Sequence, residues 1–214
     1  MKIIAENLGK RFNREWIFRH FTLTIEPAKT YAITGPNGSG KSTLSQVLWG
    51  QVPPTAGTLK YMSGGNAVQP VNLFKYVSIA APYMELIEEF TLGETIEFHF
   101  RFKAPTVGIP VESMAERMGL AHARDKKIAA FSSGMKQRVK LALAFYSDTP
   151  LLFLDEPTTN LDKQAAAWYQ DNLSLQSGRT IVIASNQEEE YPSNSIKIDL
   201  SEYKKGLQNA PPVV

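Results

Sequence analysis

The sequence predicts an α/β fold with a mainly parallel core sheet. Short apolar runs have the composition of strands that are buried on both faces. These runs alternate with longer segments of helical composition, which is the order that places helices against a parallel sheet. A glycine-rich loop joins the first run directly to a helix at about 42–49. The buried strands are expected at 31–34, 76–80, 151–154 and 180–185.

Length, charge and composition narrow the class of protein. A chain of 214 residues fits one domain, here 1–214, with a small inserted subdomain. The formal net charge of +2 is too small to argue for a nucleic-acid partner. The chain has no cysteine, so it has neither disulfides nor thiolate metal ligands. It also shows no bilayer-length apolar run and no signal-peptide pattern, and we expect a cytosolic protein.

The N-terminal part is expected to form an antiparallel β subdomain. Residues 2–6 and 16–25 have strand composition, and 21–25 alternates strictly between apolar and polar side chains. A turn at 52–57 precedes another short strand at 58–62. Residues 63–70 are expected to form a loop.

Residues 35–43, which we call the phosphate loop, fit the pattern G-x-x-x-x-G-K-[ST]. Glycines let the backbone fold around an anion, and exposed N–H groups at a helix N-terminus hold phosphates. Lys41 is expected to reach the β- and γ-phosphates, and the Ser42 hydroxyl to ligate Mg²⁺. The predicted nucleotide-binding residues are Gly35, Pro36, Asn37, Gly38, Ser39, Gly40, Lys41, Ser42 and Thr43.

Residues 83–130 differ from their surroundings and predict a small helical subdomain. Thr91 and Glu94 have the spacing of a capping box. Two prolines and a glycine interrupt the helical pattern at 104–110, and a second short helix is expected at 111–118.

The C-terminal part continues the α/β pattern. A helix is expected at 133–146 with Ser132 as its cap, and another at 162–176. A last short strand is expected at 196–200. Residues 201–214 are expected to form a loose tail.

Two carboxylates, Asp155 and Glu156, directly follow the apolar strand at 151–154. Ligands bind at the carboxyl edge of parallel sheets, where the phosphate loop also lies. Asp155 is therefore expected to hold Mg²⁺, directly or through water, and Glu156 to deprotonate the attacking water, which is worth about 10²–10⁴ in rate. The alternative is an apolar strand followed by a charged loop.

From about residue 3 to residue 200 the chain resembles the ATP-binding cassette (ABC) family of P-loop NTPases. The phosphate loop matches its Walker A motif, residues 151–157 its Walker B motif, and residues 158–162 its D-loop. Residues 131–138 stand where the family has its signature, usually L-S-G-G-Q, and we call them the signature segment. The resemblance implies ATP and Mg²⁺ as cofactors and ATP hydrolysis as the activity, with Lys41 and Glu156 as catalytic residues.

The signature segment also implies a partner, a second cassette that is either another copy of this chain or a different cassette. In the family, two cassettes pair head to tail, and the signature of one closes over the ATP of the other. Ser132 and Gly134 match the residues that contact the γ-phosphate, whereas Ser133 and Met135 depart from the pattern. Phe12 stands where the family has an aromatic side chain that stacks on adenine. Trp16 is the other candidate for that role.

Two further positions depart from the family. A glutamine near the Mg²⁺ usually follows the strand at 76–80, but Ala81 and Pro82 stand there. Where the family has a histidine at the γ-phosphate, this chain has Asn186. The Asn186 amide can donate a hydrogen bond but cannot carry a proton. Losing one such contact costs about 10²–10³ in turnover. We therefore expect tight ATP binding and slow hydrolysis.

The resemblance implies the ATP-driven subunit of a membrane transporter, with a separate permease that docks near residues 81–90. Such a subunit is peripheral on the cytoplasmic face of the membrane, and short cassettes of this type resemble those of exporters more than importers. One alternative is a soluble cassette that drives assembly, for example of a cofactor cluster. Another is a regulatory cassette with little hydrolysis.

Overall fold

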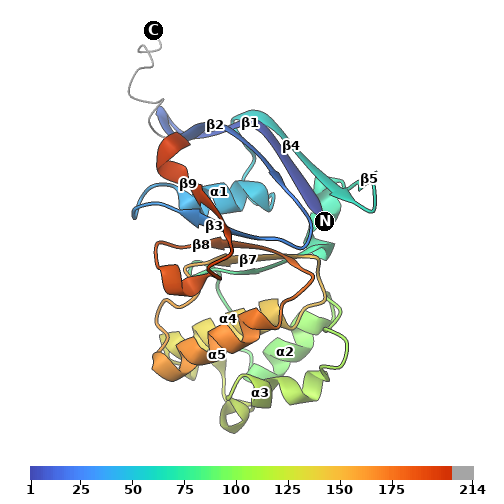
Figure 1. The fold of residues 1–214 in the computed structure, drawn as a ribbon. Helices are drawn as coiled ribbons and strands as arrows, with labels where there is room; N and C mark the ends of the chain where they lie inside the picture. The colour runs from blue at the N-terminus through green and yellow to red at the C-terminus, as the bar shows by residue number, and fades with distance from the viewer. Residues whose placement is uncertain (204–214) are drawn as a thin grey trace.

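The computed structural model describes residues 1–203, which form two sheets and a set of helices (Figure 1). The first sheet is antiparallel around β1, with strand order β2-β1-β4-β5. Its strands are β1 Lys2–Phe12, β2 Glu15–Ile25, β4 Ala56–Ser63 and β5 Asn66–Ala67.

The second sheet is the core of the molecule and is parallel throughout, with order β6-β7-β8-β3-β9. Its strands are β3 Thr30–Thr34, β6 Val77–Ala80, β7 Leu151–Asp155, β8 Thr180–Ala184 and β9 Ile196–Asp199. Every residue of β7 and β8 is buried. This central position explains why these two strands are continuous apolar runs rather than alternating ones.

The helices lie on the two faces of the core sheet. Helix α1 lies between the two sheets, and the remaining helices gather on the opposite face (Figure 1). The helices are α1 Lys41–Leu48, α2 Leu92–Phe100, α3 Met114–Arg117, α4 Ser133–Phe145 and α5 Lys163–Ser174. Short 3-10 helices lie at Pro70–Lys75, Val111–Ser113, Ala121–Ala123, Ile128–Ala130, Glu188–Glu190 and Leu200–Tyr203.

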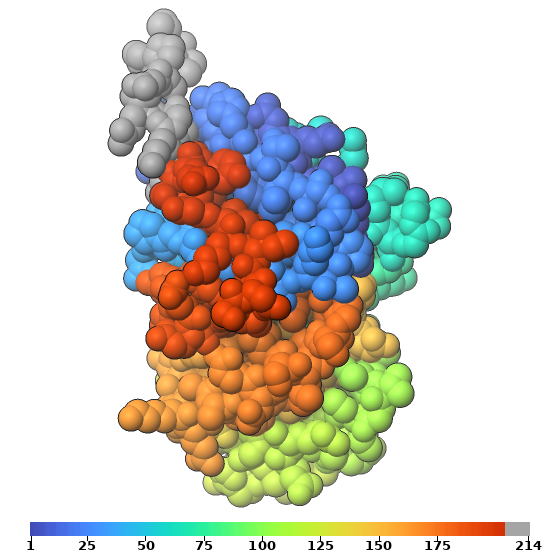
Figure 2. Space-filling view, in the orientation of Figure 1, coloured from blue at the N-terminus to red at the C-terminus, as the bar shows by residue number. Residues whose placement is uncertain are grey.

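Alternate residues of β7 enter two different hydrophobic cores. Leu151 and Phe153 pack with α1 and the antiparallel sheet, whereas Leu152 and Leu154 pack with α2, α4 and α5. This alternation follows from the two-residue period of a strand. In the space-filling view, the green and yellow helical part forms the end of the molecule opposite the blue antiparallel sheet (Figure 2).

The predicted α/β fold, with its parallel core sheet, antiparallel β part and helical part, is confirmed. Thr91 and Glu94 form the expected capping box, in which the Glu94 N–H donates to Thr91 Oγ1 at 3.1 Å and the Thr91 N–H to Glu94 Oε2 at 2.7 Å. Ser132 caps α4, and Asp162 caps α5. These local sequence signals therefore position the helix starts.

Several segments differ from the prediction. Strand β1 extends to Phe12, beyond the predicted end at residue 6, because irregular pairing between Ala5 and Lys10 interrupts its alternation. The predicted loop 63–70 contains β5. The helix predicted at 111–118 is a 3-10 turn followed by α3.

The helical part and the C-terminal end also differ from the prediction. Within residues 83–130, the first helix begins only at Leu92. Residues 201–203, which we assigned to the tail, belong to a 3-10 helix, and the Tyr203 ring packs at 4.9 Å from the Phe21 ring. The rest of the predicted tail, 204–214, lies outside the described residues. No helix in 1–203 is both long and apolar enough to span a bilayer.

Candidate functional site

The phosphate loop connects β3 to α1 and depends on its glycines. Gly35, Gly38 and Gly40 have φ of 138°, 73° and 101°, a region that side chains with a Cβ rarely adopt. A Cβ on Gly40 would also lie 2.3 Å from Cγ2 of Ile17 in β2. The antiparallel sheet therefore presses against the loop where α1 begins, and only glycine fits there.

Lys41, the first residue of α1, is buried across the loop. Its ammonium donates to the carbonyl oxygens of Gly35 at 2.9 Å and Pro36 at 3.3 Å. The Ser39 N–H donates to the Pro36 carbonyl at 3.0 Å and tightens the same turn. Both of these acceptors are neutral carbonyl groups. Because they do not neutralise the Lys41 charge, that charge is available to an anion in the loop.

Asp155 ends β7 and is fully buried. Neither of its carboxylate oxygens has a well-aligned hydrogen-bond partner among residues 1–203, although the hydroxyls of Ser42 and Tyr83 approach it. Burial raises the pKa of Asp155 to about 6, while the two hydroxyls act in the opposite direction. A buried carboxylate with free lone pairs indicates a missing cationic partner.

The donor set around Asp155 fits Mg²⁺. This ion takes hard oxygen ligands and is commonly held by one or two carboxylates together with substrate phosphates. The Asp155 carboxylate and the Ser42 hydroxyl supply such oxygens at the mouth of the phosphate loop. Residues 1–203 contain no group of three or more His, Cys, Asp or Glu side chains that could hold a metal ion.

Glu156 lies directly beyond Asp155 in a strained backbone conformation. Its φ is 42°, which is rare for a residue with a long side chain. The Glu156 N–H donates to the Ala184 carbonyl at 2.9 Å, so the bend is held by the end of β8. Strain of this kind costs about 1–3 kcal/mol and tends to occur at functional sites.

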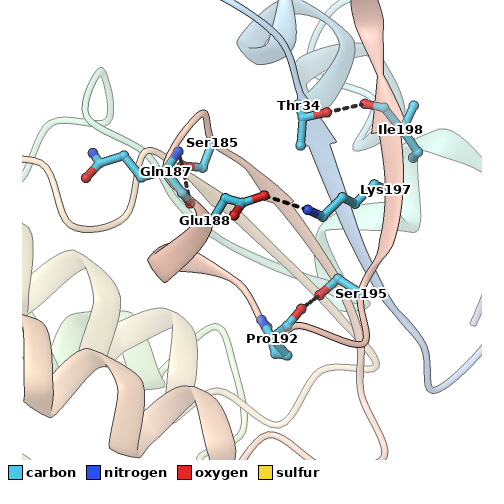
Figure 3. Close-up of polar contacts among 8 residues, drawn as sticks. All are labelled: Thr34, Ser185, Gln187, Glu188, Pro192, Ser195, Lys197 and Ile198. Atoms are coloured by element: carbon cyan, nitrogen blue, oxygen red, sulfur yellow. Dashed lines mark hydrogen bonds and ion pairs between the residues drawn. The ribbon is translucent and has the colours of Figure 1, made fainter.

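The segment after β8 reaches the phosphate loop through Asn186. The Asn186 amide donates from Nδ2 to Oδ1 of Asn37 at 3.1 Å. Two nearby contacts shape this segment: the Gln187 N–H donates to Ser185 Oγ at 2.9 Å, and Lys197 pairs with Glu188 at 2.7 Å (Figure 3). The predicted site residues 37 and 186, far apart in sequence, thus meet.

The signature segment lies at the start of α4. The Ser132 hydroxyl accepts from the Met135 N–H at 3.2 Å, as a helix cap does. A Cβ on Gly134 would lie 2.7 Å from the Asn160 carbonyl oxygen. Gln137 donates to the Pro157 carbonyl at 2.9 Å. The helix start therefore packs on the chain that leaves Asp155 and Glu156.

The two aromatic candidates for adenine stacking differ in exposure. Phe12 ends β1 and is 47% exposed, with the Lys10 ammonium 4.9 Å from its ring centre. Trp16 is partly buried, and the guanidinium groups of Arg11 and Arg19 lie 5.3 Å and 4.6 Å from its ring. Phe12 thus has the more accessible ring.

One residue near the site was missed by sequence reasoning. The Tyr83 hydroxyl approaches both Asp155 and Gln46, although the motifs point only to Ala81 and Pro82 in this segment. Burial raises the pKa of Tyr83, and the Asp155 charge acts in the same direction. The available signal was that Tyr83 is the first polar side chain after β6.

Comparisons with known proteins agree with this geometry. The family model described as "ABC transporter" matches residues 18–159. Nod factor export ATP-binding protein I of Burkholderia lata is 31% identical over 189 residues, which cover 86% of this chain and 62% of that protein. An uncharacterized ABC transporter ATP-binding protein of Bacillus subtilis, YybJ, is 28% identical over 186 residues, covering 86% and 85%.

A solved structure with the same fold is a putative ABC transporter ATP-binding protein of Pyrococcus furiosus. It superposes with a TM-score of 0.77 at 19% identity and covers 95% of this chain and 99% of that one. At this identity the likeness concerns the fold alone, which is that of an ABC ATPase cassette. The chain spans less than two thirds of the Burkholderia lata relative.

Proposed function

Because the chain belongs to the ABC transporter family, we propose that it is the ATP-binding and ATP-hydrolysing subunit of a membrane transporter. One observation carries the proposal. The phosphate loop, the Lys41 ammonium and the buried Asp155 carboxylate converge at the carboxyl edge of the core sheet. This edge is where α/β folds bind nucleotides.

ATP binds with its phosphates in the loop 35–43. The Lys41 ammonium exchanges the Gly35 and Pro36 carbonyls for phosphate oxygens, and the N–H groups at the start of α1 add donors. Ser42 and Asp155 hold Mg²⁺, which neutralises phosphate charge when it is bound. Phe12, the more exposed aromatic, stacks on adenine.

Glu156 serves as the base that takes a proton from the attacking water. Its strained backbone, held by Ala184, directs the chain out of β7 at the reacting centre. Asn186 donates its amide at the γ-phosphate in place of the Asn37 contact. Because neither Asn186 nor Ala81 supplies the group usual in the family, hydrolysis is about 10²–10³ slower than in common cassettes.

A second cassette completes the site. Ser132 and Gly134, at the N-terminus of α4, contact the γ-phosphate of the ATP held by that second cassette. The arrangement of the signature segment supports this role, since the dipole of α4 favours an anion at its start.

A separate permease docks on the helical part, which would hold the subunit at the cytoplasmic face of a membrane. A hollow of about 250 Å³ is lined by apolar side chains, several of them exposed. These apolar residues are Leu86, Ile87, Phe90, Phe98, Phe102 and Leu143. Exposed apolar surface of this kind marks interaction sites. The relative named for Nod factor export favours an exporter.

A regulatory cassette with little hydrolysis is the second candidate. The replacement of two family positions by Ala81 and Asn186 favours it. Single-turnover hydrolysis of Mg-ATP by the purified protein separates the two candidates. The transporter subunit releases phosphate, and Glu156→Gln abolishes the release while ATP binding persists. No release from the wild-type protein contradicts the leading proposal.

Partners need their own test. We expect purification from native membranes to recover the subunit with a protein that has several membrane spans, in a complex containing two cassettes. Substitution of exposed Phe98 by Glu should release the permease without changing ATP binding. Recovery of the subunit only in the soluble fraction contradicts the transporter assignment.

A further inference from the structure

The chain after β6 makes a tight turn rather than simply leaving the sheet. Ala81 is fully buried, and the Met84 N–H donates to the Ala81 carbonyl at 3.2 Å. Pro82 occupies the second position of this four-residue turn, where its fixed φ is favourable. Tyr83 occupies the third position, so the turn holds its backbone.

The turn is attached to α4 by a lysine. The Lys140 ammonium donates to the carbonyls of Pro82 at 2.9 Å and Ala81 at 3.4 Å. A second contact joins the same helix to the segment that follows, because Lys136 pairs with Glu88 at 2.5 Å. The helix that carries the signature segment therefore holds the turn directly.

The Tyr83 side chain faces the nucleotide site. Its ring lies 6.4 Å from the ring of Trp49, which packs edge-on at 5.4 Å against Phe153. Phe153 and Asp155 share a face of β7, since they are two residues apart in a strand. The Tyr83 hydroxyl approaches the Asp155 carboxylate and Gln46 of α1.

The pairing of β6 with β7 explains this proximity. Ala80 pairs with Leu154, so the two strands leave the sheet together, one into the turn and the other into Asp155. Tyr83 is 40% exposed although it lies beside a fully buried carboxylate, so its side chain extends from the surface toward Asp155.

We propose that Tyr83 is a positioning residue of the ATPase, whose hydroxyl orients the Asp155 carboxylate for Mg²⁺ and links it to α4 through Lys140. This inference rests on the proposed function. A phenol hydroxyl is one donor and also an acceptor. The hydroxyl approaches the carboxylate without a well-aligned hydrogen bond in this structure. When Mg²⁺ binds, donation to one Asp155 oxygen would leave the other free for the metal, and a movement of α4 would reach the carboxylate through the turn.

The test uses Tyr83→Phe, which keeps the ring on Trp49 and removes only the hydroxyl. Both Tyr83 and Tyr83→Phe proteins carry Glu156→Gln, so that bound ATP persists. Mn²⁺ is titrated into the ATP-loaded proteins, and free Mn²⁺ is followed by electron paramagnetic resonance. We expect Tyr83→Phe to bind Mn²⁺ about 10-fold more weakly, the usual effect of losing a partner of a metal ligand.

Metal-free ATP binding distinguishes positioning from a structural role, and Tyr83→Phe should leave it unchanged. The matched control is Tyr76→Phe, which removes a hydroxyl just before the opposite end of β6 and should leave Mn²⁺ affinity unchanged. Equal Mn²⁺ affinities of the Tyr83 and Tyr83→Phe proteins overturn the inference. If the Tyr83 protein itself binds no Mn²⁺ with ATP, the proposed function fails instead.

The link to α4 is tested with Lys140→Met, which removes the ammonium and keeps most of the stem. It should also weaken Mn²⁺ binding, by less than Tyr83→Phe, and the double variant should lose less than the product of the two single effects. Such non-additivity is the signature of residues that act through one another. Independent effects would contradict the link.

Discussion

The phosphate loop and the signature segment are both helix N-termini, yet they differ in how completely one chain equips them. In the loop, the Lys41 ammonium already lies across the mouth, and the Asp155 carboxylate has no well-aligned hydrogen-bond partner among residues 1–203. In the signature segment, Ser132 is engaged as the cap of its own helix, and Gly134 is pressed against Asn160. The phosphate loop is therefore arranged to hold an anion, whereas the polar groups of the signature segment contact neighbouring residues of the same chain.

We expect ATP binding and ATP turnover to depend on different parts of the chain. Every contact that shapes the loop, including those with Ile17 and Asn186, is made within one chain, so we expect ATP affinity to be a property of the single chain. Turnover is expected to depend also on Tyr83, Gly134 and Asn186, each of which approaches a residue far away in the sequence: Asp155, Asn160 and Asn37, respectively. Substitutions in the two regions should therefore separate binding from hydrolysis.

The largest expected effect comes from Lys41→Ala. Loss of a charged donor to two phosphates removes about 3–4 kcal/mol, so ATP binding should weaken about 10²–10³-fold. Equilibrium binding of a fluorescent ATP analogue measures this loss. Lys60→Ala is the matched control, since Lys60 forms only an exposed pair with Glu6. Equal ATP affinities of the Lys41→Ala and Lys60→Ala proteins would contradict the role of Lys41 in phosphate binding.

Gly134→Ala should lower hydrolysis about 10²-fold while leaving ATP binding unchanged. The new Cβ would meet the Asn160 oxygen at 2.7 Å, so the helix start and the D-loop must separate. A misplaced donor at a transferring phosphate costs this much in rate. Gly93→Ala is the control, because its Cβ meets nothing closer than 3.5 Å and its φ is ordinary. Weakened ATP binding by the Gly134→Ala protein would contradict the expectation that the signature segment affects hydrolysis alone.

The folding stability of the protein should depend on pH through His99, which belongs to α2. Its Nε2 lies 2.9 Å from the hydroxyl of Ser147, and burial lowers its pKa to about 4. Below about pH 6.5 the His99 side chain is protonated in the unfolded chain, whereas in the folded chain it is protonated only near pH 4. Stability therefore falls through this window, by about 2 kcal/mol at pH 5.

Urea unfolding at pH 7.5 and pH 5 measures this term. The difference should shrink by about 2 kcal/mol in His99→Gln. It should persist in His122→Gln, because His122 is exposed. An unchanged pH dependence in His99→Gln would mean that His99 is not the group responsible.

The smallest expected effect is that of Ser132→Ala on stability. Loss of the cap to the Met135 N–H should cost about 1 kcal/mol of unfolding free energy. Ser132→Asp preserves the cap but adds a negative charge where a γ-phosphate is expected. It should be as stable as the wild type yet inactive. An active Ser132→Asp protein would remove Ser132 from the nucleotide site.

Much of the fold could be predicted because it follows from local signals. The capping box at Thr91, the cap at Ser132 and the continuous apolar strands each depend on neighbouring residues. The irregular pairing of β1 and the 3-10 turn at Val111–Ser113 could not be predicted in this way. They depend on packing between distant segments, which no sequence period reports.

The candidate site divides along the same line. The glycines of the phosphate loop and the two carboxylates at the end of β7 belong to short motifs, and these motifs predicted that both groups lie at the same edge of the sheet. The contact of Gly40 with Ile17, and that of Asn186 with Asn37, joins segments far apart in sequence. Tyr83 was missed for this reason, since its approach to Asp155 depends on the register of β6 against β7.

The decisive measurement compares the ATP affinity and the steady-state turnover of the wild-type protein with those of Asn186→His. The wild-type protein should saturate with ATP below about 1 mM and turn over at about 0.01–0.1 s⁻¹. Asn186→His should raise turnover at least tenfold and leave ATP affinity unchanged. Wild-type turnover near 10 s⁻¹, or no gain from the histidine, would contradict the claim that this chain binds ATP tightly but lacks a group needed for rapid hydrolysis.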